Sequence, residues 1–300
     1  MCMSVLYSYA QLQAEVGSNA ERLAYIDFKL RFTGVIRRSD LNSEFGLAEA
    51  AASRMLSLYS EYRKDNFFHD RSLKANVIKV EAYQPLIPIE AEKALGMLSH
   101  GFNKNKLADN PLLPYRRIGH IPNQLDVDEV SKITRAIYTK RAISCCYISG
   151  NSCKHDSREL VPLALLNDGK NWIFRAYDRS DTKRSYKFKN FNFSRATKVS
   201  LIQGEEASSL NYESLSEDKL WNMPLPLFLE IHPKLNEEQK RTVRQDFGMA
   251  PEQSELFLTE NAALVWILTK MWGIDVGNPK ESELFFRFEL KNKEMIRPYL

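Results

Sequence analysis

The order of hydrophobic and polar positions in the first eighty residues predicts three helices followed by a hairpin. Residues 18–21 have the spacing of a helix-capping box, and apolar residues then recur every three or four positions until Gly34. A second, short helix is expected to end at Gly46, and a third to run from 47 to 62. Residues 67–80 have the pattern of two short strands around a turn.

The third helix has two unlike faces. Its predicted core stripe is Ala51, Met55, Leu58 and Tyr62, and the opposite face is small and polar. A short helix that ends at a glycine and leads at once into such a helix has the order of a helix-turn-helix, and the hairpin after it would form the wing. We therefore expect residues 1–80 to form a winged helix-turn-helix domain.

Hydroxyl and cationic side chains of this domain suggest that it binds double-stranded DNA. Small side chains let a helix approach base edges, and hydroxyls and cations can contact bases or phosphates. The candidate DNA-binding residues are Arg37, Arg38, Ser53, Arg54, Ser57, Arg71 and Lys74. The alternative is a three-helix packing module with a solvated face, and a net charge of only +2 over residues 1–80 does not favour DNA binding.

Residues 81–131 form a predicted linker, and residues 132–204 a domain of short strands. The linker contains five prolines and has helical patterns near 89–99 and 126–140. Five β-rich runs follow, at 143–149, 160–166, 171–178, 186–193 and 197–202. Short strands so closely spaced fit a small SH3-like or Sm-like β-barrel.

Residues 205–300 predict a small unit of the order βαβαβ. The strands are expected at 226–231, 256–259 and 284–290, and the helices at 236–247 and 262–272. The whole chain is therefore expected to be an α+β protein of several domains. Its 300 residues, 44% hydrophobic and 27% charged, are ample for two or three packed domains.

Charge is unevenly divided along the chain. Residues 132–200 hold 15 Lys and Arg against five Asp and Glu, a net charge of +10, whereas residues 201–300 hold 11 against 17, a net of −6. The basic middle indicates an anionic partner for that segment. There is no run of 18 apolar residues and no signal-peptide pattern, and the four cysteines are too few for a disulfide scaffold. We expect a cytoplasmic protein without a membrane partner.

Catalytic and metal-binding patterns are weak. Cys145, Cys146, Cys153 and His155 lack a Cys-x-x-Cys pair, and adjacent strand residues point to opposite faces. The chain has no nucleophile elbow and no glycine-rich phosphate loop. We expect no metal, no cofactor and no enzymatic activity. A nucleic-acid-processing hydrolase with a DNA-docking module is the rival class.

Several motifs together resemble the WYL domain. The resemblance rests on residues 158–162, 168–169, 172–178, 188–191 and 194–195, where Trp172-Ile173-Phe174 stands in place of the Trp-Tyr-Leu triplet. Phe45-Gly46, residues 70–74, His232-Pro233 and residues 246–249 are similar to the winged-helix WYL repressors of bacterial phage-defence operons, the BREX-regulator type. The resemblance covers nearly the whole chain and makes DNA binding by residues 18–80 the favoured interpretation.

The resemblance implies an effector-sensing domain and a dimer. A nucleotide or nucleic-acid effector would bind at Tyr147, Ser149, Arg158, Trp172, Arg175, Tyr177 and Arg195. Arginines make bidentate hydrogen bonds to phosphate, and aromatic rings stack on bases. The alternative for Trp172 and Tyr177 is that they are core residues. The C-terminal part would form a homodimer on an inverted-repeat operator, released when the effector binds. A transcriptional activator on the same scaffold is the alternative.

Overall fold

The structure is a computed structural model, and it describes residues 6–108, 113–115, 118–119, 121, 124–149, 157–182, 186–277 and 286–300. The chain divides into two compact units, the first up to Ser209 and the second from Leu210. Across the described residues, no helix is both long enough and apolar enough to cross a membrane.

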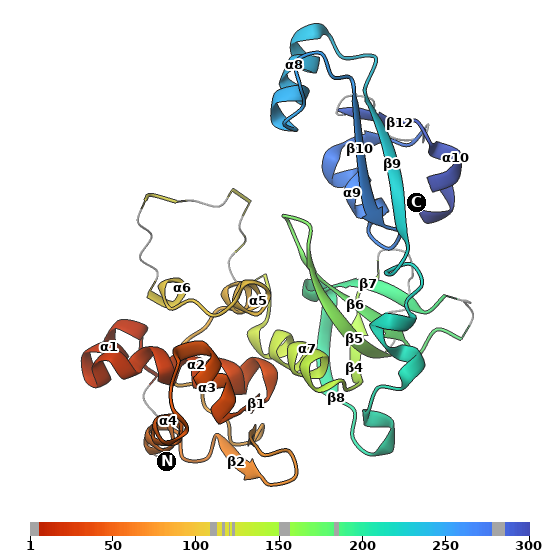
Figure 1. The fold of residues 1–300 in the computed structure, drawn as a ribbon. Helices are drawn as coiled ribbons and strands as arrows, with labels where there is room; N and C mark the ends of the chain where they lie inside the picture. Colours follow the sequence, from red (N-terminus) through yellow and green to blue (C-terminus); the bar gives the residue numbers. More distant parts are fainter. Residues whose placement is uncertain are drawn as a thin grey trace. The chain divides into compact units, whose positions relative to one another are not determined.

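The first unit begins with four helices and a three-stranded sheet. The elements are α1 (Tyr9–Val16), α2 (Ala20–Thr33), β1 (Val35–Ile36), α3 (Arg38–Phe45), α4 (Glu49–Tyr62), β2 (Phe67–Asp70) and β3 (Ala75–Ile78). The antiparallel sheet has the order β1-β3-β2. Figure 1 shows the β2–β3 hairpin beside α3 and α4. This is the predicted winged helix-turn-helix, with two additions, α1 and β1.

Helix ends follow the glycines, but one predicted cap is wrong. Gly34 and Gly46 adopt left-handed conformations, with φ of 80° and 64°, and end α2 and α3 as predicted. The capping box forms at Ser8 and Gln11, at the start of α1. Residues 17–19 form a 3₁₀ turn, so the box predicted at residues 18–21 does not form.

A long helix connects this domain to a bent five-stranded sheet. The segment contains α5 (Ala91–His100), α6 (Asn105–Ala108), α7 (Val127–Thr139), β4 (Ile143–Tyr147), β5 (Ser157–Asn167), β6 (Trp172–Asp178), β7 (Phe188–Asn192) and β8 (Ala196–Leu201). The antiparallel order is β7-β6-β5-β4-β8, with irregularities at residues 144–146 and 162–164 that bend the sheet. Within the described ranges, β7 and β8 do not pair, so the sheet is bent but not a closed barrel.

The sheet carries apolar residues on both faces. One face packs with α7 and contains Ile143, Phe174 and Phe191. The other contains Val161 and Tyr177 with neighbouring aromatic residues. Since alternate residues of a strand face opposite sides, residues 172, 174 and 176 of β6 lie on the first face, and 173, 175 and 177 on the second.

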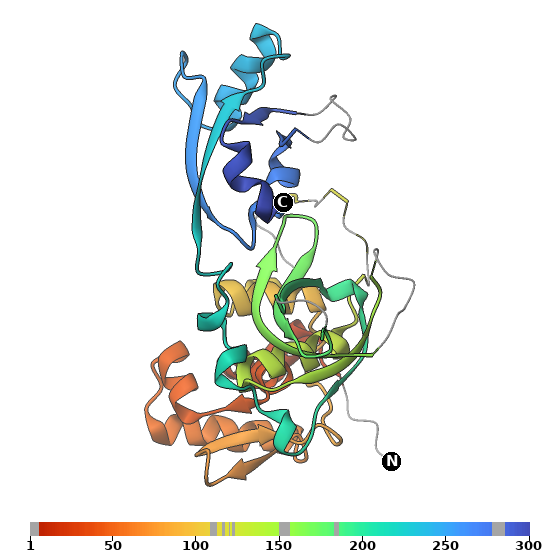
Figure 2. The same cartoon turned by 90° about the vertical axis from the view of Figure 1, so that its right-hand side faces the viewer.

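The second unit is a four-stranded sheet with helices on one face. Its elements are β9 (Pro224–Ile231), α8 (Glu237–Asp246), β10 (Glu255–Asn261), α9 (Val265–Trp272), β11 (Ile274–Asp275), β12 (Phe288–Leu290) and α10 (Lys293–Ile296), in the sheet order β10-β9-β12-β11. Figure 2 shows α9 and α10 on one side of β9 and β10. The predicted βαβαβ order is present, with β11 added. Residues 284 and 285 of the predicted last strand lie outside the described residues.

Candidate DNA-binding groove and effector surface

A polar groove lies between α4, the start of α3 and the β2–β3 hairpin. Its volume is about 380 Å³. The groove is lined by Arg37, Arg38, Ser53, Leu56, Ser57, Ser60, Phe67, His69, Lys74 and Asn76. Five of the seven candidate DNA-binding residues therefore line it, whereas Arg54 and Arg71 lie exposed, on α4 and at the hairpin turn, outside the lining.

The hairpin tip is ordered by one carboxylate. Asp70 Oδ1 accepts hydrogen bonds from the Ser72 amide (2.8 Å), the Ser72 hydroxyl (2.6 Å) and the Leu73 amide (3.1 Å). The Ser72 hydroxyl and the Leu73 amide are the main causes that lower the pKa of Asp70. Lys74 follows with a φ of 48°. The turn thus holds Arg71 and Lys74 at the end of the wing.

Cations in and around the groove are available to a ligand. Arg38 forms an ion pair with Glu49 at 3.3 Å, but their side chains are 55% and 81% exposed. The pair therefore contributes little to stability, and Arg38 can leave Glu49 for a phosphate. In the part of the chain that the structure describes, the side chains of Arg54, Arg71 and Lys74 make no recorded hydrogen bond or ion pair. These cations can therefore meet phosphates without first breaking a buried contact.

Three polar residues of the groove were not among the candidates from the sequence: Ser60, His69 and Asn76. His69 and Asn76 are paired in the β2–β3 register, and their side chains lie 3.2 Å apart. Side chains opposite each other on two paired strands share a face, so a hairpin register through residues 70–75 could have revealed them. Ser60 follows Ser53 and Ser57 at helical spacing.

Helix α4 is held in place on α2 by a buried carboxyl group, that of Asp27. The Asp27 carboxylate accepts hydrogen bonds from the hydroxyls of Tyr59 (2.6 Å) and Tyr83 (2.9 Å). It also accepts hydrogen bonds from the backbone amides of Leu86 (3.0 Å) and Ile87 (3.3 Å). Burial raises the pKa of both Asp27 and Tyr59. Since Tyr59 belongs to α4, these bonds fix how α4 lies on α2.

Some candidate effector residues lie on the α7-facing side of the bent sheet. The Arg158 guanidinium forms an ion pair with the buried Asp178 at 2.9 Å and lies 5.8 Å from the ring centre of Tyr147. Lys189 binds the same carboxylate at 2.8 Å. Arg158 remains 24% exposed, so a ligand could reach it. Trp172, in contrast, is a core residue, only 9% exposed.

Other candidates lie elsewhere. Arg175 is buried on the opposite face of β6, where it donates to the Asn190 side-chain oxygen (3.0 Å) and the Tyr186 hydroxyl (2.9 Å). Tyr177 is also buried there. Arg195 is exposed in a 3₁₀ turn, and Ser149 is half-buried after β4. The seven candidates therefore do not form one cluster.

The described cysteines do not favour a nucleophilic or metal-binding site. Burial raises the pKa of Cys145 to about 12, which keeps its thiol protonated and unreactive near neutral pH. Cys153 and His155 lie outside the described residues. Among those described, no three His, Cys, Asp or Glu residues are placed to hold a metal ion.

A winged helix with a polar groove, a basic bent sheet and a small α+β unit together indicate a DNA-binding transcriptional regulator. Family models match all three parts. The BrxR transcriptional regulator winged helix-turn-helix domain matches residues 18–100, the WYL domain residues 128–200, and the BrxR transcriptional regulator C-terminal dimerization domain residues 225–296. The chain belongs to the WYL-domain winged-helix transcriptional repressors of the BrxR type, a family of regulators rather than enzymes.

Two relatives match nearly the whole length of the chain. The chain is 28% identical over 280 residues to the DNA-binding transcriptional repressor CapW of Escherichia coli (strain KTE188), covering 92% of this chain and 89% of that one. It is 27% identical over 288 residues to CapW of Pseudomonas aeruginosa, covering 92% and 90%. The solved structure of the proteasome accessory factor B/C (PafBC) of Arthrobacter aurescens is 12% identical, with a TM-score of 0.25 over 93% of this chain and 48% of that one, too low to inform the fold.

Proposed function

We propose that this protein is a homodimeric repressor that binds an inverted-repeat operator of a bacterial phage-defence operon in the cytoplasm. Helix α4 enters the major groove, and Ser53, Arg54 and Ser57 contact base edges or nearby phosphates. Arg37, Arg38, Arg71 and Lys74 hold the phosphate backbone. The observation that supports the proposal is the groove, whose lining contains hydroxyls of α4, two arginines at the start of α3 and the wing lysine.

The central sheet would receive a nucleotide or nucleic-acid effector. We take the bent sheet to correspond to the SH3-like or Sm-like barrel of a WYL domain within residues 132–204, left open between β7 and β8 in the described residues, after a linker over 81–131. The net charge of +10 over residues 132–200 and the partial exposure of Arg158 support an anionic ligand. Effector binding can release the operator only by the difference in its affinity for the two states of the dimer.

The first experiment identifies the DNA. Purified protein is mixed with fragmented genomic DNA, and the retained fragments are sequenced. We expect one or a few inverted repeats with half-sites about one helical turn or more apart. Retention of DNA without any shared sequence, or of no DNA, would contradict sequence-specific binding.

The second experiment tests repression. A reporter gene is placed behind the retained fragment, in cells with and without the gene for this protein. We expect reporter activity to rise when the gene is deleted. A fall in activity would instead identify an activator on the same scaffold.

A further inference from the structure

Strand β10 forms an open edge of the second unit. The sheet order β10-β9-β12-β11 places it at the border, paired only with β9. Its seven residues, Glu255–Asn261, contain neither proline nor glycine. A long edge strand without such interruptions readily pairs with another strand, and proteins usually protect or use such an edge.

The hydrogen-bond pattern shows which backbone groups point outward. The Ile231 amide donates to the Ser254 carbonyl at 2.8 Å, so these two residues form a hydrogen-bonded pair. Such pairs alternate along an antiparallel ladder, so Leu256 and Leu258 bond to β9, and Phe257 and Thr259 direct their amides and carbonyls outward. Within the described chain, no hydrogen bond is recorded for those outward groups.

The side chains of β10 are also incompletely covered. Leu229 and Leu227 of β9 are 1% and 0% exposed, yet their register partners Leu256 and Leu258 are only half-buried. On the other face, Phe257 is 62% exposed and contacts Phe228 at a centroid distance of 5.3 Å. The apolar surface thus continues to the edge and stops there.

We propose that β10 pairs antiparallel with β10 of a second copy, which joins two four-stranded sheets into one. The two-fold axis passes beside Phe257, so that Phe257 of each copy faces its counterpart. Leu256 then faces Leu258 of the second copy, and Glu255 faces Thr259. The outward amide and carbonyl of Phe257 bond to those of its counterpart, and those of Thr259 bond to Glu255 of the second copy, whose carbonyl also accepts from the Gln253 side chain.

Neighbouring registers fit less well. A register centred on Leu258 places Leu256 opposite Glu260, and one centred on Leu256 places Leu258 opposite Ser254. The register centred on Phe257 keeps apolar residues opposite apolar residues and brings no like charges together. The proposal rests on the homodimer proposed above, and the matched dimerization domain, residues 225–296, contains the whole strand.

Disulfide trapping tests the register. Residues in a hydrogen-bonded antiparallel pair have Cα atoms about 5.5 Å apart, which a disulfide can span. We expect Phe257→Cys to give a covalent dimer under mild oxidation. Phe228→Cys is the matched control, because three strand spacings of about 4.8 Å would separate its two copies. The unmodified protein, with its own four cysteines, sets the background.

A second variant tests the outward amide without touching the β9 ladder. Thr259→Pro removes an amide that points away from β9, whereas Thr259→Ala keeps it. By sedimentation equilibrium, we expect Thr259→Pro to weaken dimerisation at least tenfold and Thr259→Ala to leave it nearly unchanged. Circular dichroism checks that both variants fold. If Thr259→Pro does not fold, the disulfide experiment alone tests the pairing of β10.

The outcomes separate this inference from the proposed function. If the unmodified protein is monomeric at operator-binding concentrations, the proposed homodimer itself is wrong. If it is dimeric but Phe257→Cys forms no more covalent dimer than Phe228→Cys, pairing through β10 is overturned while the homodimer stands. Unchanged dimerisation of a folded Thr259→Pro variant would overturn it too.

Discussion

At the scale of single residues, Asp27 shows how a buried carboxyl group can fix the position of helix α4. All four of its recorded partners are hydrogen-bond donors: two tyrosine hydroxyls and two backbone amides. The Tyr59 hydroxyl in turn accepts from the Asn66 side-chain amide at 2.7 Å. A carboxylate satisfies this arrangement because both of its oxygens are acceptors.

We expect Asp27→Asn to be costly although the side chain keeps its shape. An amide would turn its NH₂ group toward hydroxyl or amide donors and leave buried groups unsatisfied, lowering the free energy of unfolding by about 2–4 kcal/mol. Urea denaturation measures this change. Asp65→Asn, whose carboxylate is 72% exposed, is the control and should shift stability by less than about 0.5 kcal/mol. Equal stability of both variants would argue against the buried hub.

Arg195 is the exposed cation among the effector candidates and allows a clean separation of functions. Arg195→Ala should leave operator affinity unchanged, because this residue lies outside the winged helix, and should remove the response to effector. Gel shifts with the operator, with and without a mixture of nucleotides and short oligonucleotides, measure both. Lys198→Ala, an exposed cation on β8, is the control. An equal loss of operator binding by Arg195→Ala would contradict this division of labour.

At the scale of elements, helix α4 shows what periodicity can and cannot decide. The sequence predicted its extent and its polar face, but its buried row is Ala52, Leu56 and Tyr59, one position beyond the predicted stripe. Neighbouring rows are both apolar, and the predicted residues are half-buried on the flank. The partners on α2, above all Asp27, determine which row lies innermost, and a local pattern does not contain that information.

We expect the double substitution Ser53→Ala and Arg54→Ala to lower specific DNA binding by about 1–3 kcal/mol for each good base contact removed. Affinity for a scrambled sequence should fall less, because phosphate contacts carry most nonspecific binding. Competition gel shifts with operator and scrambled DNA measure the difference. Gln13→Ala, at an exposed position of α1, is the control. Unchanged specificity would show that another element reads the bases.

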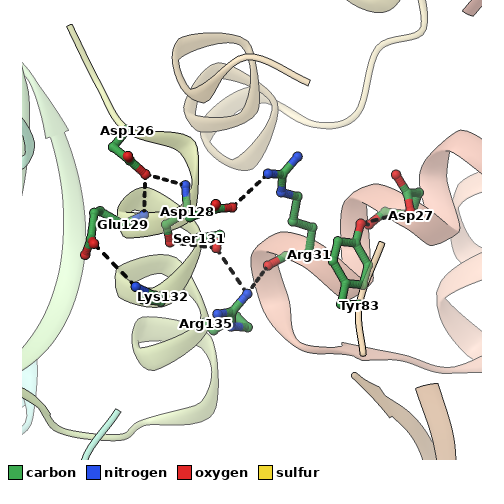
Figure 3. Close-up of polar contacts among 9 residues, drawn as sticks. All are labelled: Asp27, Arg31, Tyr83, Asp126, Asp128, Glu129, Ser131, Lys132 and Arg135. Carbon is green, nitrogen blue, oxygen red and sulfur yellow. Dashed lines mark hydrogen bonds and ion pairs between the residues drawn. The ribbon is translucent and has the colours of Figure 1, made fainter. Parts of the chain in front are cut away.

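Helix α7 ties the winged helix to the central sheet. Arg135, 6% exposed, donates to the Arg31 carbonyl (2.8 Å) and the Ser131 hydroxyl (3.1 Å), as Figure 3 shows. On the sheet side, the Glu129 carboxylate accepts a hydrogen bond from the Val199 amide of β8 at 2.6 Å. Helix α7 is therefore hydrogen-bonded both to α2 and to the sheet.

Substitutions of two charged residues of α7, Arg135 and Asp128, should differ in their effect on the free energy of unfolding. Arg135→Ala removes a buried side chain and leaves the Arg31 carbonyl without its partner, so we expect a loss of about 2–4 kcal/mol. Asp128→Ala breaks only the 2.9 Å pair with Arg31, in which Asp128 is 73% exposed, and should cost about 1 kcal/mol or less. Thermal and urea unfolding compare them. A larger loss for Asp128→Ala would reverse this ranking.

At the scale of the whole molecule, the sequence predicted the order of the helices and strands better than the contacts between elements that are distant in sequence. The wing and the C-terminal βαβαβ order follow from local patterns, but the two-residue strand β1 exists only because Val35 and Ile36 pair with β3. The seven effector candidates do not lie in one cluster for a similar reason. Alternation in β6 places Arg175 and Trp172 on opposite faces, and a family motif that runs along the strand does not record which face stays open.

The charge distribution yields a last prediction, on salt. If the groove contacts DNA, each phosphate that loses its partner should change the slope of log affinity against log salt by about 0.9. A dimer contains two copies of Lys74, so Lys74→Ala should make the slope shallower by about 1.8. Lys170→Ala, exposed in the +10 segment, should leave the slope unchanged, because Lys170 lies outside the winged helix. Fluorescence anisotropy from 50 to 200 mM salt, about the range over which such slopes are measured, compares the two. A larger effect of Lys170→Ala would move the DNA contact to the central sheet.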